Sequence, residues 1–330
     1  MASNLVTGAS GFLGSHLAEA LVARGESVRA LVRPTSNTAH LQSLGVELAY
    51  GDLTDEQSLR RALRGIERVY HCAALVADWG ASWAAFRAAN VTGLRSLLEA
   101  ATAVGVRRFI HVSTSDVYGY PDSPVDETAP YRLRGWPYGD TKIAGEQLVW
   151  SYYHEHGLPI TVVRPVTVYG PRSIPFVVEI VALLTRGSMA CIGGGRKPAG
   201  LGYVTNVVDL LLRAADSERS LGQAYNASDG SNITWRQYVG RLAAIVGAPN
   251  PRRVIPYRSA YVAGWAMERI YAALGIKTRP LLTRLAVELM GTDQSFTIDK
   301  ARRELGYEPV VDFDEGMRRV EVWLRERNAV

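Results

Sequence analysis

A glycine-rich turn between a short apolar strand and a helix constrains this chain more than any other feature of its sequence. The strand is predicted at residues 3–7, and the turn after it carries Gly8, Gly11 and Gly14. In such a turn the first glycine permits a tight bend, the second lets the backbone approach a pyrophosphate, and the third lets helix and strand pack closely. The start of the helix then offers free N–H groups to the phosphates. The motif predicts a dinucleotide site made by Gly8, Gly11, Phe12, Leu13 and Gly14.

Apolar strands alternate with helices through the first half of the chain. Strands are predicted at residues 28–32, 46–53, 66–74, 107–112 and 159–165. Strand–helix–strand units at this short spacing indicate an α/β fold, with a doubly wound parallel Rossmann sheet. The rhythm changes after residue 166. We therefore expect a dinucleotide-binding domain at 1–166, to which 203–230 returns, and a smaller, segment-built substrate lobe at 167–202 and 231–330.

The composition is that of an ordinary globular protein. The 330 residues are 47% hydrophobic and 21% charged, and the net charge of +5 is interspersed, so nothing favours nucleic-acid binding. Cys72 and Cys191 lie far apart in apolar runs, which predicts reduced thiols in a cytoplasmic protein, with no disulfide and no metal site. The chain enters its first strand almost at once, leaving no room for a signal peptide. His71 and His111 fall in predicted core strands and are expected to be satisfied buried residues.

The stretch from residue 261 to 290 is apolar but interrupted by charges. The stretch is broken by Glu268, Arg269, Lys277, Arg279 and Arg284. These charges exclude a spanning helix, so no transmembrane segment is expected. An apolar lid over the site and a peripheral contact with a membrane surface remain as alternatives.

Arg33 follows directly after the second predicted strand. A site that prefers NAD places a carboxylate at this position for the ribose 2′-hydroxyl, whereas an arginine accepts the 2′-phosphate of NADP. No acid is present in residues 28–37. The sequence therefore favours NADP over NAD, and a solvated arginine at a strand end is the alternative.

Two further motifs carry candidate chemistry. Ser113, Thr114 and Ser115 end the strand at 107–112, where a hydroxyl could hold a substrate oxygen, although hydroxyls also cap strand ends with no further role. Tyr138 and Lys142 are four residues apart, hence one helical turn apart on one face. A lysine held there would lower the pKa of the phenol by Coulomb attraction.

The three motifs in this order and spacing resemble the extended short-chain dehydrogenase/reductase family. The branch of 3β-hydroxysteroid dehydrogenases and 2-alkyl-3-oxoalkanoate reductases is the most similar, because of the stretches 203–209 and 255–291. The resemblance implies that Tyr138 is the general acid/base and that Lys142 lowers its pKa and binds the nicotinamide ribose. It places the catalytic hydroxyl on Thr114, with Ser113 as the alternative.

Further cofactor contacts follow from the same resemblance. It implies that Asp52 and Leu53 contact adenine, that Pro165 and Val166 lie beside the nicotinamide, and that Asn90 is used structurally. Ala73 and Ala74 are small enough to leave room for a ligand. The cofactor-binding residues expected are Gly8, Gly11, Phe12, Leu13, Gly14, Arg33, Asp52, Leu53, Ala73, Ala74, Asn90, Lys142, Pro165 and Val166.

The expected substrate is a small apolar molecule. Nucleotide-sugar enzymes of the family usually carry an Arg-Asp pair where this chain has the uncharged stretch 199–202, although Arg196 and Lys197, a few residues earlier, could substitute for the pair. We therefore expect an NADP-dependent enzyme that interconverts a ketone and a secondary alcohol on a steroid-like or β-keto/β-hydroxy acid-like molecule. A nucleotide-sugar epimerase or dehydratase with tightly bound NAD is the alternative, and a non-enzymatic redox sensor a more distant one. The expected substrate contacts are Asp78, Trp79, Ser115 and Trp136.

A homodimer is expected through the predicted helices at about 94–104 and 143–155. Leu97, Val149 and Trp150 are the apolar candidates for outward positions on these helices. The alternative is that these three side chains face the sheet.

Overall fold

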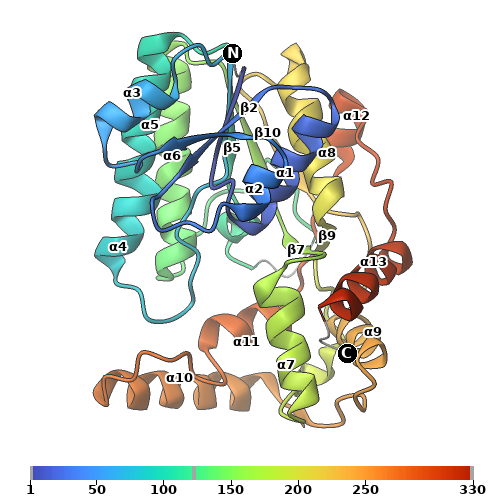
Figure 1. Cartoon of the computed structure of the whole chain (residues 1–330). Helices are drawn as coiled ribbons and strands as arrows, with labels where there is room; N and C mark the ends of the chain where they lie inside the picture. Colours follow the sequence, from blue (N-terminus) through green and yellow to red (C-terminus); the bar gives the residue numbers. More distant parts are fainter. Residues whose placement is uncertain (1–2, 121–123, 328–330) are drawn as a thin grey trace.

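A seven-stranded parallel sheet forms the centre of the molecule (Figure 1), in a computed structural model that describes residues 3–120 and 124–327. The strand order is β10-β6-β5-β4-β1-β2-β3. The order reverses between β1 and β4, which places the topological switch point of the sheet there. The strands are β1 (Asn4–Thr7), β2 (Val28–Val32), β3 (Glu47–Tyr50), β4 (Arg68–His71), β5 (Arg108–Val112), β6 (Ile160–Pro165) and β10 (Ala224–Ala227).

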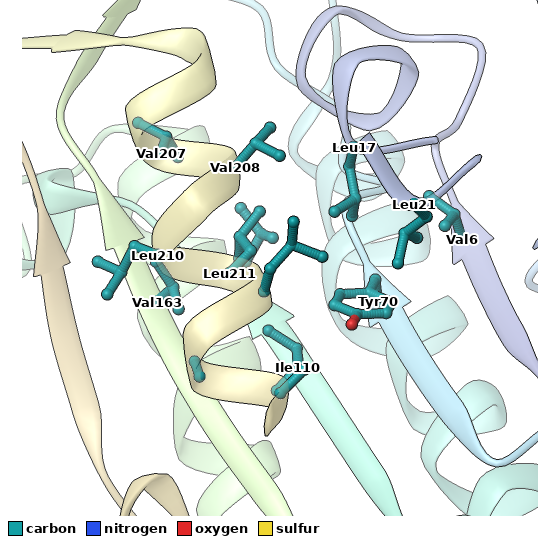
Figure 2. Packing of buried hydrophobic residues seen from close by; sticks show 14 of the residues in the cluster. Val6, Leu17, Leu21, Tyr70, Ile110, Val163, Val207, Val208, Leu210 and Leu211 are labelled. Carbon is teal, nitrogen blue, oxygen red and sulfur yellow. The ribbon is translucent and has the colours of Figure 1, made fainter. Parts of the chain in front are cut away.

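Helices cover both faces of this sheet, as Figure 1 shows. One layer holds α3 (Glu56–Ala62), α5 (Gly93–Val104) and α6 (Pro137–His156). The other holds α1 (Phe12–Ala23), α2 (Ala39–Ser43), α8 (Val204–Asp216) and α12 (Asp299–Leu305). Figure 2 shows the apolar side chains of α8 beside Ile110 and Val163 of the sheet, with those of α1 next to them. The parallel sheet confirms the prediction made from the alternation of strands and helices at short spacing.

Helices α5 and α6 pack side by side on one face of the sheet. Leu97 and Val149 are fully buried in the core beneath them, and Trp150 is partly buried, with its indole N–H donating to the Tyr131 hydroxyl. The prediction that Leu97 and Val149 point outward is therefore wrong. Their side chains fill the layer between helices and sheet, so these residues offer no apolar surface for a dimer.

Predicted strand and helix ends shift by a few residues. The strand predicted at 66–74 ends at His71, and Ala73 and Ala74 lie in the following loop. Before α5 come the short helix α4 (Trp83–Arg87) and a π-helical segment at Ala88–Thr92.

The rest of the chain packs below the carboxyl edge of the sheet in Figure 1. It contains two small parallel pairs, β7 (Thr167–Tyr169) with β9 (Leu201–Tyr203) and β8 (Cys191–Ile192) with β11 (Val254–Ile255). The large aromatic side chains of Tyr169, Trp235 and Tyr238 lie in its core. Its helices are the π-helical turn Ile174–Val178, α7 (Glu179–Thr185), α9 (Trp235–Ile245), α10 (Tyr257–Ala273), α11 (Arg284–Gly291) and α13 (Phe313–Glu326).

His71 and His111 are both buried but differ in their hydrogen bonding. His71 is hydrogen-bonded to the Thr7 hydroxyl at 2.8 Å, as expected of a satisfied core residue. His111 is buried as well, but neither of its ring nitrogens has a hydrogen-bond partner among the described residues, so the expectation is wrong for His111. Cys72 and Cys191 are free thiols.

Within residues 3–120 and 124–327, no helix has both the length and the apolar character needed to cross a bilayer.

Candidate active site

The glycine-rich turn has the geometry that a dinucleotide cradle needs. Gly8 adopts φ +70°, a left-handed conformation that favours glycine, and its carbonyl accepts from the Gly11 N–H at 2.9 Å. A Cβ added at Gly14 would lie 2.2 Å from the Gly8 carbonyl oxygen, so helix α1 packs against the turn only because residue 14 lacks a side chain. Gly11 is the N-cap of α1, and no side chain caps this helix. The turn therefore fits the phosphates of a dinucleotide.

The predicted cofactor residues gather at the carboxyl edge of the sheet. Arg33 follows β2 with an exposed side chain. Asp52 follows β3; two hydrogen bonds from Thr54 lower the pKa of its carboxyl group, and the positive charge of Arg33 lowers it further. An adenosine ribose beside a strand end of this kind would find both a cation and a carboxylate. The residues that lie at this edge are Gly8, Arg33, Asp52, Leu53, Ala73, Ala74, Thr114, Pro165 and Val166.

Asn90 has a structural place inside the π-helical segment. Its side-chain amide accepts from the Leu75 N–H at 2.8 Å and donates to the Leu75 carbonyl and the Thr141 hydroxyl. Asn90 thus ties the loop after β4 to the helix that carries Tyr138. These hydrogen bonds agree with the structural use that the resemblance implies.

The end of β5 and the first turns of α6 bring the catalytic candidates together. Lys142 is buried, and its Nζ donates to the Val112 carbonyl oxygen at 2.7 Å. The Thr114 hydroxyl, which follows β5, lies beside the Tyr138 phenol and acts to lower its pKa. Pro137 begins α6, where its missing N–H has no partner to lose.

The pKa shifts of this pair differ from the expectation. Burial lowers the pKa of Lys142 to about 8, against the opposing charge of Glu146. Burial raises the pKa of Tyr138 above its ordinary value, the nearby Asp116 carboxylate raises it further, and the Thr114 hydrogen bond opposes both. Lys142 is not among the groups that shift the Tyr138 pKa, so the predicted lowering by Lys142 is not what the structure shows. Tyr138 carries its proton at neutral pH.

The two candidate hydroxyls, Ser113 and Thr114, point to different neighbours. The Ser113 hydroxyl donates to the buried Glu146 carboxylate at 2.6 Å. The Thr114 hydroxyl accepts from the Asp116 N–H at 3.2 Å and lies beside the Tyr138 phenol. Thr114, and not Ser113, thus faces the phenol.

A buried polar network that the sequence did not reveal supports this corner. The Arg164 guanidinium in β6 pairs with the Glu146 carboxylate in α6, and both side chains are buried. Arg164 also donates to the Tyr118 hydroxyl at 2.7 Å, and the Tyr131 hydroxyl donates to Glu146 at 2.9 Å. An arginine inside an apolar strand, and a glutamate one turn after Lys142, were the available signals. The network fixes α6 against β5 and β6.

Asp116 was also missed, although it follows the three hydroxyl residues directly. Burial raises the pKa of its carboxyl group to about 6, and a hydrogen bond with Tyr120 opposes that shift. The Asp116 backbone and Cβ lie within 4 Å of a Cβ placed on Gly139, next to Tyr138. A titratable carboxyl group thus lies beside the phenol.

A cavity of about 380 Å³ lies against Tyr138. Asp78 in its wall accepts from the Arg279 guanidinium at 2.6 Å, and the Trp79 indole donates to the Ile276 carbonyl at 3.2 Å. The Trp136 indole donates to the buried Glu288 carboxylate of α11 at 2.9 Å. The lining residues are Ala77, Asp78, Trp79, Gly80, Ala81, Phe86, Trp136, Pro137, Tyr138, Tyr271, Ala272, Gly275, Ile276, Lys277 and Leu285.

Three of the four expected substrate contacts therefore meet at one cavity. Ser115 is the exception, because it is buried in the 3-10 turn Ser115–Tyr118 and lies outside the cavity wall. The loop at 77–81, residues 271–277 and Leu285 of α11 together form the outer wall of the cavity.

Comparison with known proteins gives the relatives of this chain. The profile of the NAD dependent epimerase/dehydratase family matches residues 4–228. The chain is 33% identical to a 2-alkyl-3-oxoalkanoate reductase of Stenotrophomonas maltophilia, over 96% of this chain and 97% of the relative. It is 35% identical to a 4-hydroxy-2-methyl-3-oxo-4-farnesyl-3,4-dihydroquinoline-1-oxide ketoreductase of Stigmatella aurantiaca, over 94% of this chain and 93% of that relative. A 3β-hydroxysteroid dehydrogenase/Δ5→4-isomerase of Mycobacterium tuberculosis is 32% identical, over 93% of this chain and 86% of that relative.

Solved structures agree with the fold. The UDP-glucose 4-epimerase of Thermotoga maritima, crystallised with UDP-glucose, has a TM-score of 0.79 at 26% identity, over 98% of this chain and 99% of that one. The glycine turn, the Rossmann sheet, the family profile and the relatives point to one assignment. The chain belongs to the extended short-chain dehydrogenase/reductase family, in the branch of the 2-alkyl-3-oxoalkanoate reductases and 3β-hydroxysteroid dehydrogenases, and is an NAD(P)-dependent oxidoreductase.

Proposed function

We propose that this protein interconverts a ketone and a secondary alcohol on an apolar small molecule, with NADP as the hydride carrier and Tyr138 as the general acid/base. The observation that carries the proposal is the place of Tyr138, which forms part of the wall of the cavity and lies beside Thr114. A phenol that keeps its proton in a mainly apolar cavity is suited to protonating a carbonyl oxygen.

The residues of the cradle fit the dinucleotide. The Gly8–Gly14 turn would hold the pyrophosphate, Arg33 the 2′-phosphate, and Lys142 the nicotinamide ribose. When bound, the nicotinamide supplies or accepts the hydride.

The chain's own groups manage the proton and the oxygen. Thr114 donates a hydrogen bond to the substrate oxygen and so fixes it beside Tyr138. In reduction Tyr138 gives its proton to that oxygen, and in oxidation it takes the proton back. With a pKa of about 8, Lys142 is mainly protonated at neutral pH, so that it can donate hydrogen bonds to the hydroxyls of the nicotinamide ribose.

The apolar substrate class rests on the cavity and on the relatives. Asp78 is paired with Arg279, so its charge is neutralised in the wall, and aromatic and aliphatic side chains surround it. The names of the relatives include an alkyl-oxoalkanoate, a farnesyl quinoline and a steroid.

The test is NADPH oxidation with 2-alkyl-3-oxoalkanoates and 3-ketosteroids as substrates. Tyr138→Phe should lower kcat by roughly a hundredfold to ten-thousandfold, the range of one general acid, with NADPH affinity unchanged. Tyr153→Phe, on the same helix but distant from the cavity wall, is the matched control and should keep its activity. Near-normal turnover by Tyr138→Phe would refute the proposed mechanism.

The second candidate is a nucleotide-sugar epimerase or dehydratase with tightly bound NAD, favoured by the fold shared with UDP-glucose 4-epimerase. Against it, residues 199–202 carry no charge, and Ala199 and Leu201 are buried in the core around β9. NAD that co-purifies without exchanging, together with tight UDP-sugar binding, would establish this candidate instead.

A further inference from the structure

Helix α10 is attached to the rest of the protein along one narrow stripe. Its buried residues, Ala260, Gly264 and Glu268, recur every four positions and so lie on a single face. A Cβ added at Gly264 would lie 3.1 Å from the Arg284 backbone nitrogen, which shows how closely α10 packs on the start of α11. Glu268 accepts from the Arg284 N–H at 2.7 Å and from its guanidinium at 2.6 Å. Figure 1 shows α10 along the lower edge of the molecule, away from the main sheet.

The opposite face of α10 is open to solvent and carries apolar side chains, with Arg258 and Arg269 on the same face. Val262 is 62% exposed, Trp265 is 49% exposed and Leu274, at the C-terminal end of the helix, is 68% exposed. Ala263, Ile270 and Ala273 are exposed as well. An interfacial helix has this pattern, with a tryptophan and aliphatic side chains on the face that enters the bilayer.

The charges around this face have one sign. Between Pro251 and Leu285 the chain carries seven Arg and Lys side chains and one acidic side chain, Glu268, which is buried. Arg284 pairs with Glu268, and Arg279 pairs with Asp78. The other five cations are exposed and have no ion-pair partner in the described parts of the chain: Arg252, Arg253, Arg258, Arg269 and Lys277.

We propose that α10 and its flanking cations dock this protein on the surface of an anionic lipid bilayer. The apolar face would enter the interface while the cations contact lipid phosphates, which attract them by roughly 5-fold in affinity for each side chain. A second copy of this chain is a poorer occupant, because a symmetric pairing of α10 would bring the two sets of cations together.

The position of the cavity, next to the end of α10, relates the docking to the binding of substrate. Tyr271, Ala272, Gly275 and Ile276, at the C-terminal end of α10, form one wall of the cavity that contains Tyr138. Docked along α10, the protein would present this cavity to the lipid surface, where an apolar substrate is dissolved. This consequence rests on the proposed function, but the docking itself does not.

Flotation of the full chain with vesicles tests the proposal. The protein should float with vesicles of phosphatidylglycerol mixed with phosphatidylcholine, should bind pure phosphatidylcholine far less, and should be released as salt is raised. Val262→Asp should weaken vesicle binding by roughly tenfold or more, because it places a charge on the inserted face. Val310→Asp, an equally exposed valine that lies outside α10 (78% exposed), is the matched control and should bind like the wild type.

A double variant that removes two positive charges tests the electrostatic contribution to vesicle binding. Arg252→Gln/Arg253→Gln should weaken binding by roughly twentyfold or more, whereas Arg61→Gln/Arg64→Gln, exposed on the sheet domain, should not. Failure of the wild-type protein to float would overturn the proposal, as would equal losses in the Val262→Asp and Val310→Asp variants. A concentration-dependent dimer that Val262→Asp abolishes, without vesicle binding, would assign the face to a second copy. Because flotation needs no catalysis, an inactive protein that still floats would refute the proposed function and leave the docking intact.

Discussion

At the scale of single residues, the proposed preference for NADP rests on the charge of Arg33 at the end of β2. Arg33→Ala should raise the Kd for NADPH by roughly tenfold to a hundredfold, because a charge-assisted hydrogen bond to the 2′-phosphate is lost, and should leave the Kd for NADH unchanged. Titration of each nucleotide by fluorescence measures both constants. Arg107→Ala, exposed near the opposite edge of the sheet, should change neither. Equal affinities of the wild-type protein for both nucleotides would show that Arg33 is an ordinary solvated side chain.

Asp116 should give the reaction a dependence on pH that Tyr138 and Lys142 do not explain. Ionisation of Asp116, with a pKa of about 6, places a negative charge beside Tyr138 and makes the phenol a weaker acid. The rate of ketone reduction should therefore fall as pH rises through this value. A pH–rate profile of Asp116→Asn should lack that step, and persistence of the step in the variant would assign it to another group.

The same carboxyl group affects stability, with a sign that follows from its pKa. The folded-state pKa of about 6 lies above the ordinary value of 3.8, so between these two values the folded protein keeps a proton that the unfolded chain releases. The stability from this group is full below the lower value and is lost as pH rises through the upper one. Urea unfolding of Asp116→Asn should lack this fall, and the variant should be more stable than wild type at neutral pH.

At the scale of elements, the ion pair of Glu146 and Arg164 joins α6 to β6. Glu146→Gln should lower the free energy of unfolding by roughly 3 kcal/mol, since it leaves Arg164 buried without its counter-charge. Urea denaturation measures the change. Glu155→Gln, exposed on the same helix, should stay within about 0.5 kcal/mol of wild type. A similar small change in Glu146→Gln would mean that the network is dispensable for stability.

The elements that the sequence predicted are those with a local signal. Buried strands such as 108–112 and 160–165 appear in the sequence as mainly apolar runs, and three closely spaced glycines identify the turn at Gly8. The contacts that escaped prediction join residues distant in the sequence: Ser113 with Glu146, Arg164 with Tyr118, and Asp78 with Arg279. No spacing rule connects such residues, because tertiary packing brings them together. The strands β8 and β11, two residues each, are too short to leave a periodic pattern.

The outward placement of Leu97 and Val149 failed for a related reason. An amphipathic helix shows that it has an apolar face but does not show what covers that face. In this molecule the sheet and the neighbouring helix cover it. Val262, Trp265 and Ile270 of α10 are exposed instead, within the stretch for which the sequence left open a lid and a membrane contact.

At the scale of the whole molecule, the cavity depends on a junction between distant segments. Arg279 pairs with Asp78 of the loop after β4 and, at 3.4 Å, with Glu179 of α7. Arg279→Gln should raise KM for the ketone by roughly two- to fivefold, as expected for a partly exposed ion pair, with little change in kcat or in NADPH affinity. Steady-state kinetics measure these constants. Arg303→Gln on α12 is the control, and a loss confined to kcat would show that Arg279 acts on the chemistry instead.

The cavity also combines two separate regions of the sequence. The family profile ends at residue 228, next to the last strand of the sheet, whereas the outer wall of the cavity comes from residues 271–277. Every residue proposed to handle hydride or proton is thus encoded before residues 271–277, which are proposed to meet the rest of the substrate. Evolution can rewrite the second region while the first stays intact, and a protein engineer can do the same by exchanging residues 257–285 between relatives.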